Sequence, residues 1–286
     1  MDYTSMQQLM KQAARDNKRI GEIVLAVEAE KENESPDTIR GQMVISWEVM
    51  KQSLKKGVTE DIRSISGLSG GDGKLFFERQ PKYLSSNISK AVAWALGIAE
   101  VNAAMGRIVA CPTAGSSGIV PAALMLAKER LALDEETIIT ALFTAAGIGI
   151  VCSINASISG AEGGCQAETG VAAAMAAGAL TDLAGGSPTM VGHAVALCLT
   201  NMLGLVCDPV AGLVEVPCVL RNAGGLMQAL LAAELALAGI QSRIPVDEVI
   251  EAMSEVGNSL PESLRETALG GLANTPTGNQ YRKKVE

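Results

Sequence analysis

Apolar residues recur along almost the whole chain in runs that suit helices, and the strict alternation expected of strands is nearly absent. The pattern predicts two amphipathic helices near the start, over residues 4–32 and 36–56. Ser35 and Pro36 mark the start of the second, because Pro is favoured in the first turn of a helix. Further helices are predicted over residues 89–105, 118–132, 135–152, 166–184, 188–203, 221–239 and 246–257. We therefore expect an all-α fold.

Charged residues are unevenly distributed along the chain. Residues 1–90 carry 27 of them, whereas residues 91–240 carry only 15, so the middle of the chain is expected to be buried. We predict a single helical domain over 1–286, with N-terminal helices in 1–65 and a core with a C-terminal tail in 66–286. The active site is expected in the longer connections between helices, since loops on a rigid scaffold commonly carry function. These connections span residues 106–117, 153–165 and 204–220.

Composition and charge narrow the class of protein. The chain is 48% apolar but only 3% aromatic, which suits closely packed helices better than a sandwich or barrel. Its net charge of -8 and the lack of a basic stripe argue against nucleic-acid binding. The N-terminus has no apolar stretch of signal-peptide type, so a cytoplasmic protein is expected. Residues 138–154 approach the length of a membrane span, but Gly147, Gly149 and the polar stretch that follows favour a buried helix and no membrane contact.

Residues 64–75, SISGLSGGDGKL, form a glycine-rich loop. A nucleotide-binding P-loop needs a Gly five residues before its last Gly, and a Ser or Thr after its Lys. Leu68 and Leu75 occupy these two places, so no nucleotide site is predicted. We interpret the segment as a flexible crossing or lid.

Six cysteines occur in a chain without a secretion signal, which makes metal or redox chemistry a better expectation than disulfides. Cys165, Cys207 and Cys218 lie in or beside predicted loops, where backbone amides can hydrogen-bond to the sulfurs of a cluster. A structural zinc site normally takes four ligands, and His193 is the single histidine. Three thiolates with an open position fit a cubane iron–sulfur cluster better. Free cysteines also act as small buried apolar side chains, and the spacing alone leaves that alternative open.

The other three cysteines receive a structural interpretation. Cys152 and Cys198 have apolar helical neighbours and are expected in the core. Cys111 lies beside Pro112 at the start of a polar loop, and a structural role is favoured for it too.

The loop that precedes the predicted helix at residue 118 has the features of an anion site. Unpaired backbone N–H groups at a helix start attract a carboxylate, and hydroxyl side chains strengthen such a site. An ordinary capped helix has a similar sequence. The candidate substrate-binding residues of this loop are Thr113, Gly115, Ser116, Ser117 and Gly118.

A second polar segment comes just before the first loop cysteine. Asn155 and Ser157 are further candidates for substrate binding, although a plain polar loop would look similar. The candidates for a general base are His193, Glu162 and Glu168. His193 lies in the middle of a predicted helix, which is more typical of a structural histidine. A group supplied by a partner chain is an equal alternative.

Several long motifs resemble one known family. PTAGSSGIVPA, NASISGAEGGCQAE and LGLVCDPVAGLVEVPCVLRNA, in this order, resemble the α-chain of bacterial iron–sulfur L-serine dehydratases. SGLSGGDGKL and the C-terminal LPESLRETALGGLANTPTG resemble it as well, so the similarity covers essentially the whole chain. The resemblance implies an all-helical fold and a 4Fe-4S cluster on Cys165, Cys207 and Cys218. It also implies conversion of L-serine to pyruvate and ammonia without pyridoxal phosphate, with an open iron as the Lewis acid for the leaving hydroxyl.

Two departures from the family pattern bear on partners. Single-chain members carry an additional domain with a Ser-His-Thr motif, which is absent here, so a separate β-subunit and a hetero-oligomer are implied. Some members end in a cysteine, whereas this chain ends in KKVE, which leaves the fourth cluster ligand open to water or substrate. The competing interpretations are a related iron–sulfur cysteine desulfidase, a non-catalytic cluster carrier or redox sensor, and a helical scaffold protein with incidental cysteines.

Overall fold

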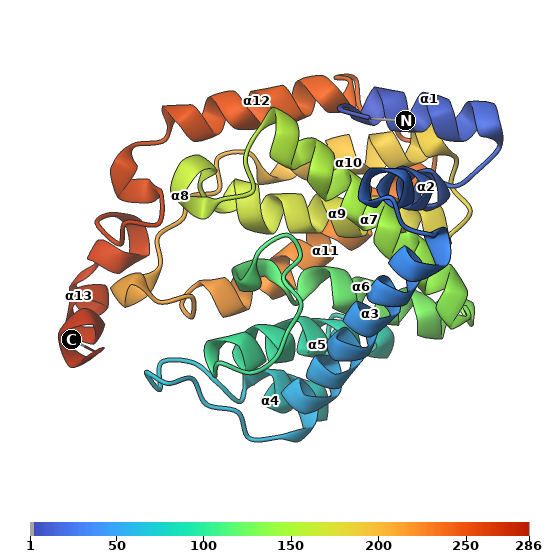
Figure 1. Cartoon of the computed structure of the whole chain (residues 1–286). Helices are drawn as coiled ribbons and strands as arrows, with labels where there is room; N and C mark the ends of the chain where they lie inside the picture. Colours follow the sequence, from blue (N-terminus) through green and yellow to red (C-terminus); the bar gives the residue numbers. More distant parts are fainter. Residues whose placement is uncertain (1–2, 286) are drawn as a thin grey trace.

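The computed structural model describes residues 3–285, and within this range it contains 13 α-helices and no strand (Figure 1). The predicted all-α fold is confirmed, and the helices form a single domain. The chain begins with α1 (Met6–Asp16), α2 (Ile20–Glu32) and α3 (Pro36–Thr59). The prediction of one continuous helix over 4–32 was wrong. Asn17 takes the left-handed conformation (φ 52°) and ends α1, a role that Asn accepts more readily than most residues.

The centre of the domain is α9 (Val171–Leu183), in which every residue is buried. Its small side chains let the surrounding helices approach closely, and a Cβ on Gly178 would lie only 2.3 Å from Ile148 Cδ1. The helices that surround α9 are α6 (Ile119–Leu131), α7 (Glu135–Asn155), α10 (Pro188–Met202) and α11 (Cys218–Leu237), and α5 (Ser86–Ala103) packs against α6 and α11 from outside (Figure 1). The helices predicted for this region are therefore confirmed, with ends that shift by a few residues.

Within the described residues, α7 alone is long and apolar enough to cross a membrane. Other parts of the protein bury 72% of its apolar window, so α7 has the character of the predicted core helix.

The glycine-rich segment becomes helical halfway along. Its last residues form the first turns of α4 (Asp72–Glu78), so the prediction of a loop up to residue 75 was wrong there. A Cβ on Gly73 would lie 2.6 Å from Gly97 Cα of α5, and a Cβ on Gly57 of α3 would lie 2.4 Å from the Gly97 carbonyl carbon. Three glycines therefore allow α3, α4 and α5 to meet with their backbones in contact.

Glu100 of α5 accepts hydrogen bonds from the backbone at the start of α4. Its carboxylate is buried and accepts hydrogen bonds from the N–H groups of Asp72 (2.7 Å) and Gly73 (3.2 Å). Burial raises the pKa of Glu100 above its usual value, and these two hydrogen bonds oppose that shift only in part.

We predict that Glu100 makes the stability of the protein depend on pH. Because its pKa is higher in the folded chain than in the unfolded chain, stability is lost as pH rises from about 4.5 through the folded pKa. Glu100→Gln cannot titrate, so the free energy of unfolding of the wild type relative to this variant should be larger in acid than at neutral pH. Urea denaturation across this range measures it, and a constant difference would contradict the prediction.

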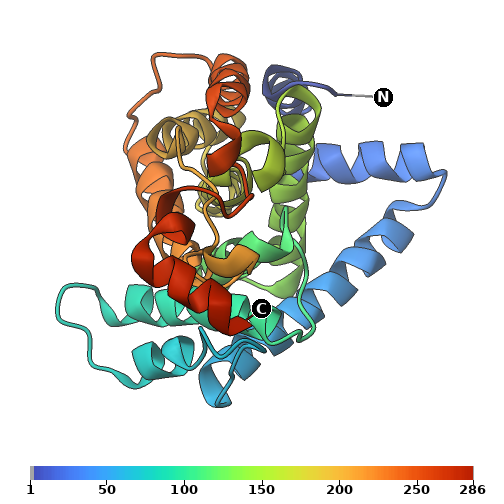
Figure 2. The ribbon, with the colours of Figure 1, turned by 90° about the vertical axis from the view of Figure 1, so that its left-hand side faces the viewer.

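The C-terminal part wraps around one side of the core. It comprises α12 (Val246–Ser259) and α13 (Pro276–Val285), joined by an irregular segment. Figure 2 shows this red segment in front of the connection that leads to α11, and α13 packs against the short turn Val210–Gly212 of that connection. Most of this C-terminal tail is exposed, and its last ten described residues are helical.

Candidate functional site

Three cysteines from separate segments meet at the edge of the core. Cys165 follows the short α8 (Gly160–Gly163), Cys207 lies in the connection after α10, and Cys218 is the first residue of α11. Burial raises the pKa of each thiol, to about 12 for Cys218. Cys165 raises the pKa of the other two thiols further, and Cys218 raises that of Cys207. These mutual effects place the three sulfurs in one neighbourhood of the structure, although the ligand atoms that lie within 4.8 Å of one another are those of Glu168, Cys207 and Glu266.

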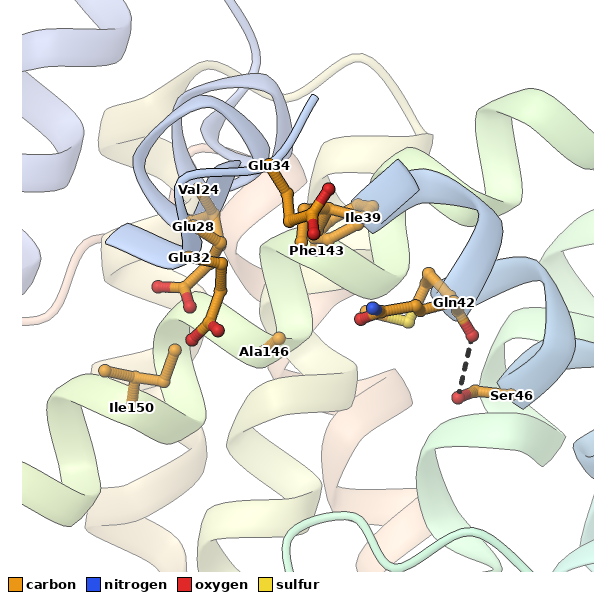
Figure 3. A pocket seen from close by; sticks show the side chains of 11 residues that line it. Val24, Glu28, Glu32, Glu34, Ile39, Gln42, Ser46, Phe143, Ala146 and Ile150 are labelled. Atoms are coloured by element: carbon orange, nitrogen blue, oxygen red, sulfur yellow. Dashed lines mark hydrogen bonds between the residues drawn. The ribbon is translucent and has the colours of Figure 1, made fainter. Parts of the chain in front are cut away.

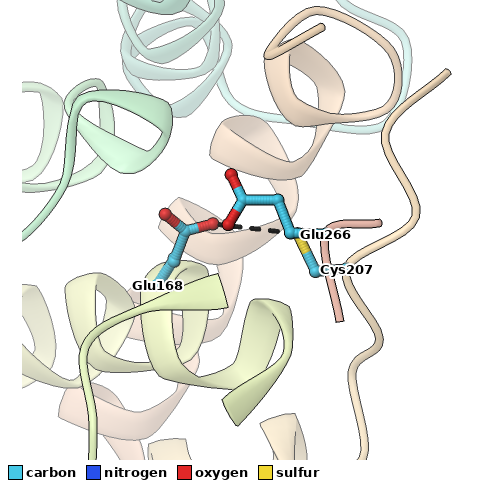
Figure 4. Close-up of side chains that lie close together, drawn as sticks. All are labelled: Glu168, Cys207 and Glu266. Carbon is cyan, nitrogen blue, oxygen red and sulfur yellow. Dashed lines mark hydrogen bonds between the residues drawn. The ribbon is translucent and has the colours of Figure 1, made fainter. Parts of the chain in front are cut away.

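Two carboxylates complete this group, which we call the thiol cluster (Figure 4). Ligand atoms of Glu168, Cys207 and Glu266 all lie within 4.8 Å of one another, and Cys207 Sγ is 4.0 Å from Glu168 Oε2. Burial raises the pKa of Glu168, and the nearby Glu266 raises it further. Glu168 was among the candidates for a general base, whereas Glu266 was not selected from the sequence. Glu266 lies in the C-terminal motif LPESLRETALGGLANTPTG, but nothing in that motif indicated which of its residues lie near the cysteines.

Arg221 supplies positive charge beside the thiols. Its guanidinium is hydrogen-bonded to the Cys165 sulfur and pairs with Asp208 at 2.8 Å. Its Nη1 group donates a third hydrogen bond, also 2.8 Å, to the Val206 carbonyl. The carboxylate of Asp208 is almost fully buried, so the pair is shielded from water and keeps a fixed position. Arg221 therefore compensates negative charge on the cluster sulfurs.

Gly160 lies between the Glu168 carboxylate and the Cys207 sulfur. An added Cβ would lie 2.7 Å from Glu168 Oε2 and 3.0 Å from Cys207 Sγ. Only a residue without a side chain leaves this space open. Two buried thiols, one half-buried thiol, a compensating guanidinium and a cradle that a single Cβ would fill together fit a thiolate-bound metal cluster.

We predict that Gly160→Ala folds normally but binds a metal cluster on these thiols poorly. The atoms that its Cβ meets are ends of side chains, which can move when free but cannot when Cys207 is a ligand. The expected result is roughly wild-type unfolding with cluster occupancy reduced several-fold, measured by iron content after anaerobic reconstitution. Gly224→Ala on α11 is the matched control, since nothing lies within 4 Å of its added Cβ. Equal iron content in both variants would contradict the prediction.

The loop before α6 reaches the thiol cluster through Thr113. The Thr113 hydroxyl is hydrogen-bonded to Glu168 and lies 3.1 Å from Ser116 Oγ. Ser117 is fully buried, and its Oγ has no hydrogen-bond partner within the described residues. A buried hydroxyl without a partner is costly unless a ligand or water uses it. The predicted carboxylate site therefore lies beside the thiol cluster with one free hydroxyl.

Asn222 joins this loop to Cys218, and sequence reasoning missed it. Its side-chain amide donates to the carbonyls of Gly115 (2.8 Å) and Cys218 (2.9 Å), and its oxygen accepts from the Gly118 N–H at 2.9 Å. The Gly118 amide is thus already paired. No signal in the sequence marked this residue, because its full burial is known only from the structure.

The remaining site candidates lie away from these contacts. Asn155 donates to the carbonyls of Thr4 and Val151, which ties the end of α7 to the N-terminal segment. Ser157 donates to Glu162 at 2.6 Å. His193 lies within α10, and no hydrogen bond or ion pair joins it to the thiols within residues 3–285. The roles predicted for these residues remain predictions.

The other cysteines occupy apolar surroundings. Cys152 and Cys198 are fully buried in the core, as predicted. Cys111 lines an apolar cavity of about 380 Å³, and its thiol lies 3.7 Å from the Val109 carbonyl. Burial accounts for its raised pKa, and none of the three clustered cysteines contributes to that shift.

A neighbouring hollow of about 450 Å³ lies between α2, α3 and α7 (Figure 3). Glu28, Glu32 and Glu34 line one side and apolar residues such as Phe143 line its floor. It contains none of the candidate site residues.

The fold and site define a class of protein: a helical domain that gathers three loop thiols, two carboxylates and a guanidinium at one edge of its core. Comparison with known proteins agrees with this class. Residues 15–273 match the family model described as serine dehydratase alpha chain, so the chain belongs to that family, as its motifs predicted.

It is 51% identical to a probable L-serine dehydratase alpha chain of Bacillus subtilis, covering 93% of this chain and 89% of the relative. It is 45% identical to an L-serine dehydratase alpha chain of Peptoniphilus asaccharolyticus, covering 93% and 92%. A Streptomyces coelicolor L-serine dehydratase is 38% identical over 87% of this chain, which corresponds to only 56% of that longer relative.

Proposed function

We propose that this chain is the cluster-carrying subunit of an L-serine dehydratase, which converts L-serine to pyruvate and ammonia. The observation that carries the proposal is the meeting of Cys165, Cys207 and Cys218 with Glu168 and Glu266. Two relatives of this chain are named as L-serine dehydratase alpha chains, one of them as probable, which supports L-serine as the substrate.

Cys165, Cys207 and Cys218 are the residues that would hold a 4Fe-4S cluster. When bound, the cluster would supply a Lewis acid for the hydroxyl that leaves the substrate. Arg221 balances the charge of the thiolates, and Gly160 keeps the space between Cys207 and Glu168 open.

The chain's own side chains account for substrate binding and proton transfer. Ser117 Oγ, with the Thr113 and Ser116 hydroxyls, is placed to bind the substrate carboxylate. Glu168, fixed by Thr113, is placed to accept the α-proton at Oε2 beside Cys207. Loss of this proton and of the hydroxyl gives water and 2-aminoacrylate. Hydrolysis of its imine tautomer by a second water gives pyruvate and ammonia.

Anaerobic reconstitution with iron and sulfide tests the proposal. The expected result is a brown protein that forms pyruvate from L-serine when its partner chain is present. Glu168→Gln should retain the cluster absorbance but lose roughly 100-fold or more in kcat, the usual contribution of a positioned base. A colourless protein, or pyruvate formation that Glu168→Gln leaves unchanged, would refute the corresponding part of the proposal.

A partner chain, the β-subunit, has a suitable surface to bind. A groove of about 660 Å³ runs between the glycine-rich segment, the end of α5 and the loop before Cys218. Ile65 and Met105 line it and are 80% and 79% exposed, which is unusual for large apolar side chains beside a functional site. Glu215 on the same loop accepts hydrogen bonds from Ser66 and Ser69. These bonds tie the glycine-rich segment to the connection between Cys207 and Cys218. We propose that the β-subunit covers this groove.

We predict that Met105→Lys weakens the complex with the β-subunit by about 10- to 100-fold, because apolar anchors dominate such interfaces. Gel filtration and calorimetry of the two chains measure it. The control is Ile45→Lys on α3, which is also exposed (62%) but lies away from the groove. Equal affinity of the two variants would place the partner elsewhere.

We also propose that the protein acts in the cytoplasm, as expected for a metabolic enzyme whose most apolar helix is largely buried.

A further inference from the structure

A second polar cavity, of about 390 Å³, lies between α8 and α12. We call it the α8–α12 cavity. The two helices meet where a Cβ on Gly257 would lie 2.8 Å from Gly163 Cα, so one wall is rigid. Gln166 fixes the floor through hydrogen bonds to the Met253 carbonyl and from the Gly204 N–H. Its polar lining residues are Ser157, Glu162, Gln166, Ser254, Asn258 and Arg265.

Opposite charges face this cavity without pairing to each other. Arg265 makes one long hydrogen bond, from Nη1 to the Glu162 carbonyl at 3.5 Å, and its Nε is buried without a partner within the described residues. The Glu162 carboxylate accepts from Ser157 through Oε2, and Oε1 makes no hydrogen bond within residues 3–285. No ion pair within 4.0 Å joins the two side chains. A molecule with one negative and one positive group would satisfy both.

The backbone of Arg265 connects this cavity to the thiol cluster. Cys207 donates its N–H to the Leu264 carbonyl (2.9 Å) and accepts from the Glu266 N–H (2.8 Å). The backbone turns sharply here, because Glu266 takes the left-handed conformation (φ 62°). Arg265 accordingly lines the cavity, whereas Glu266 joins Cys207 in the thiol cluster.

We propose that the α8–α12 cavity binds a small zwitterion of the α-amino-acid class, distinct from the substrate site. Arg265 holds its carboxylate and Glu162 its ammonium group. Occupation tightens the Arg265 segment against Cys207, so the cavity regulates the thiol cluster. Binding at this site does not depend on the proposed catalytic function.

Calorimetry with L-alanine tests the proposal. L-alanine is a zwitterion but lacks the hydroxyl that elimination requires, and the chain is used without iron. We expect saturable binding that Arg265→Gln and Glu162→Gln each weaken by about 10-fold or more, because each variant removes a charged partner. Acetate and methylamine, which carry one charge each, should bind at least about 10-fold more weakly than L-alanine.

Matched variants and a second readout keep the test decisive. Arg243→Gln and Glu78→Gln remove exposed charges away from the cavity and should leave binding unchanged. L-alanine should also slow hydrogen exchange of the Cys207 and Glu266 amides, in the wild type and not in Arg265→Gln. Lack of saturable binding would overturn the proposal, as would equal binding by Arg265→Gln and Arg243→Gln. Binding that persists with unchanged exchange at Cys207 would overturn the regulatory part.

If the proposed dehydratase activity fails but L-alanine binds as described, the cavity stands and the catalytic proposal falls. Binding that is lost in Cys165→Ala, with Arg265 variants unaffected, would instead assign L-alanine to the thiol cluster. The two proposals are therefore separated by the same set of variants.

Discussion

Cys207→Ala is expected to leave a folded chain that cannot retain the proposed iron–sulfur cluster. Cys207 is the thiol that both carboxylates of the site approach, and its pKa is raised by burial and by Cys165 and Cys218. With one of its three thiolates missing, the proposed cluster would lose a third of the protein ligands that hold it. Pyruvate formation from L-serine should fall by about 1,000-fold or more, because the Lewis acid is lost outright.

The measurement combines iron content, absorbance in the cluster band and a pyruvate assay, all under anaerobic conditions. Cys198→Ala is the control, since this thiol is buried in α10 and belongs to the core. The control should lose only about 1 kcal/mol of stability, from the small cavity left behind, and keep its colour. If both variants lose colour equally, the thiol cluster is not the iron site.

The helices of this protein could be predicted from sequence because apolar runs and cap residues mark them directly. Ser35, Ser85, Asp134 and Ser187 each cap a helix that begins near its predicted start. The break after α1 could not be predicted, because the residues from Asp16 to Arg19 contain no Gly or Pro and Asn17 supplies the turn by its left-handed conformation.

The start of α9 shows a different limit of sequence reasoning. A regular helix was predicted from residue 166, but Gln166–Gly170 form a π-helical turn. The Gln166 N–H donates to the Leu205 carbonyl instead of to its own helix, and Cys165 lies 3.0 Å from Thr169 Oγ1. The first of these contacts is made with the connection that carries Cys207, and local propensity does not report it. Such turns often occur at functional sites.

The site itself could be predicted only where loop residues are chemically distinctive. The three predicted ligands met this condition because each is a cysteine in or beside a predicted loop, within two residues of a Gly or Pro. Glu266 did not, since the bridge between Cys207 and Arg265 brings it in from a distant part of the sequence. Arg221 and Asn222 lie on α11 and look like ordinary polar positions until their burial is known.

Asp208→Ala is expected to be among the most destabilising single substitutions in this protein. The carboxylate is 3% exposed and accepts from Arg221 Nη2 (2.8 Å) and from the Leu272 N–H (2.7 Å). It therefore fixes both the start of α11 and the segment that leads to α13. Its removal leaves a buried guanidinium without its carboxylate, at a cost of about 3–5 kcal/mol in the free energy of unfolding. Urea denaturation measures this against the exposed control Asp61→Ala, expected within about 0.5 kcal/mol of the wild type.

A double variant distinguishes an unpaired charge from simple loss of packing. Asp208→Ala with Arg221→Met removes both charges of the pair, so the desolvation cost of an isolated guanidinium disappears. The double variant should therefore be more stable than Asp208→Ala alone, although it loses the Arg221 contact to Cys165 and should hold the cluster poorly. If Arg221→Met instead adds its full cost to that of Asp208→Ala, the pair does not act as a unit. The stability of this corner would then come from packing around Gly271, whose added Cβ would lie 2.4 Å from Asp208 Oδ2.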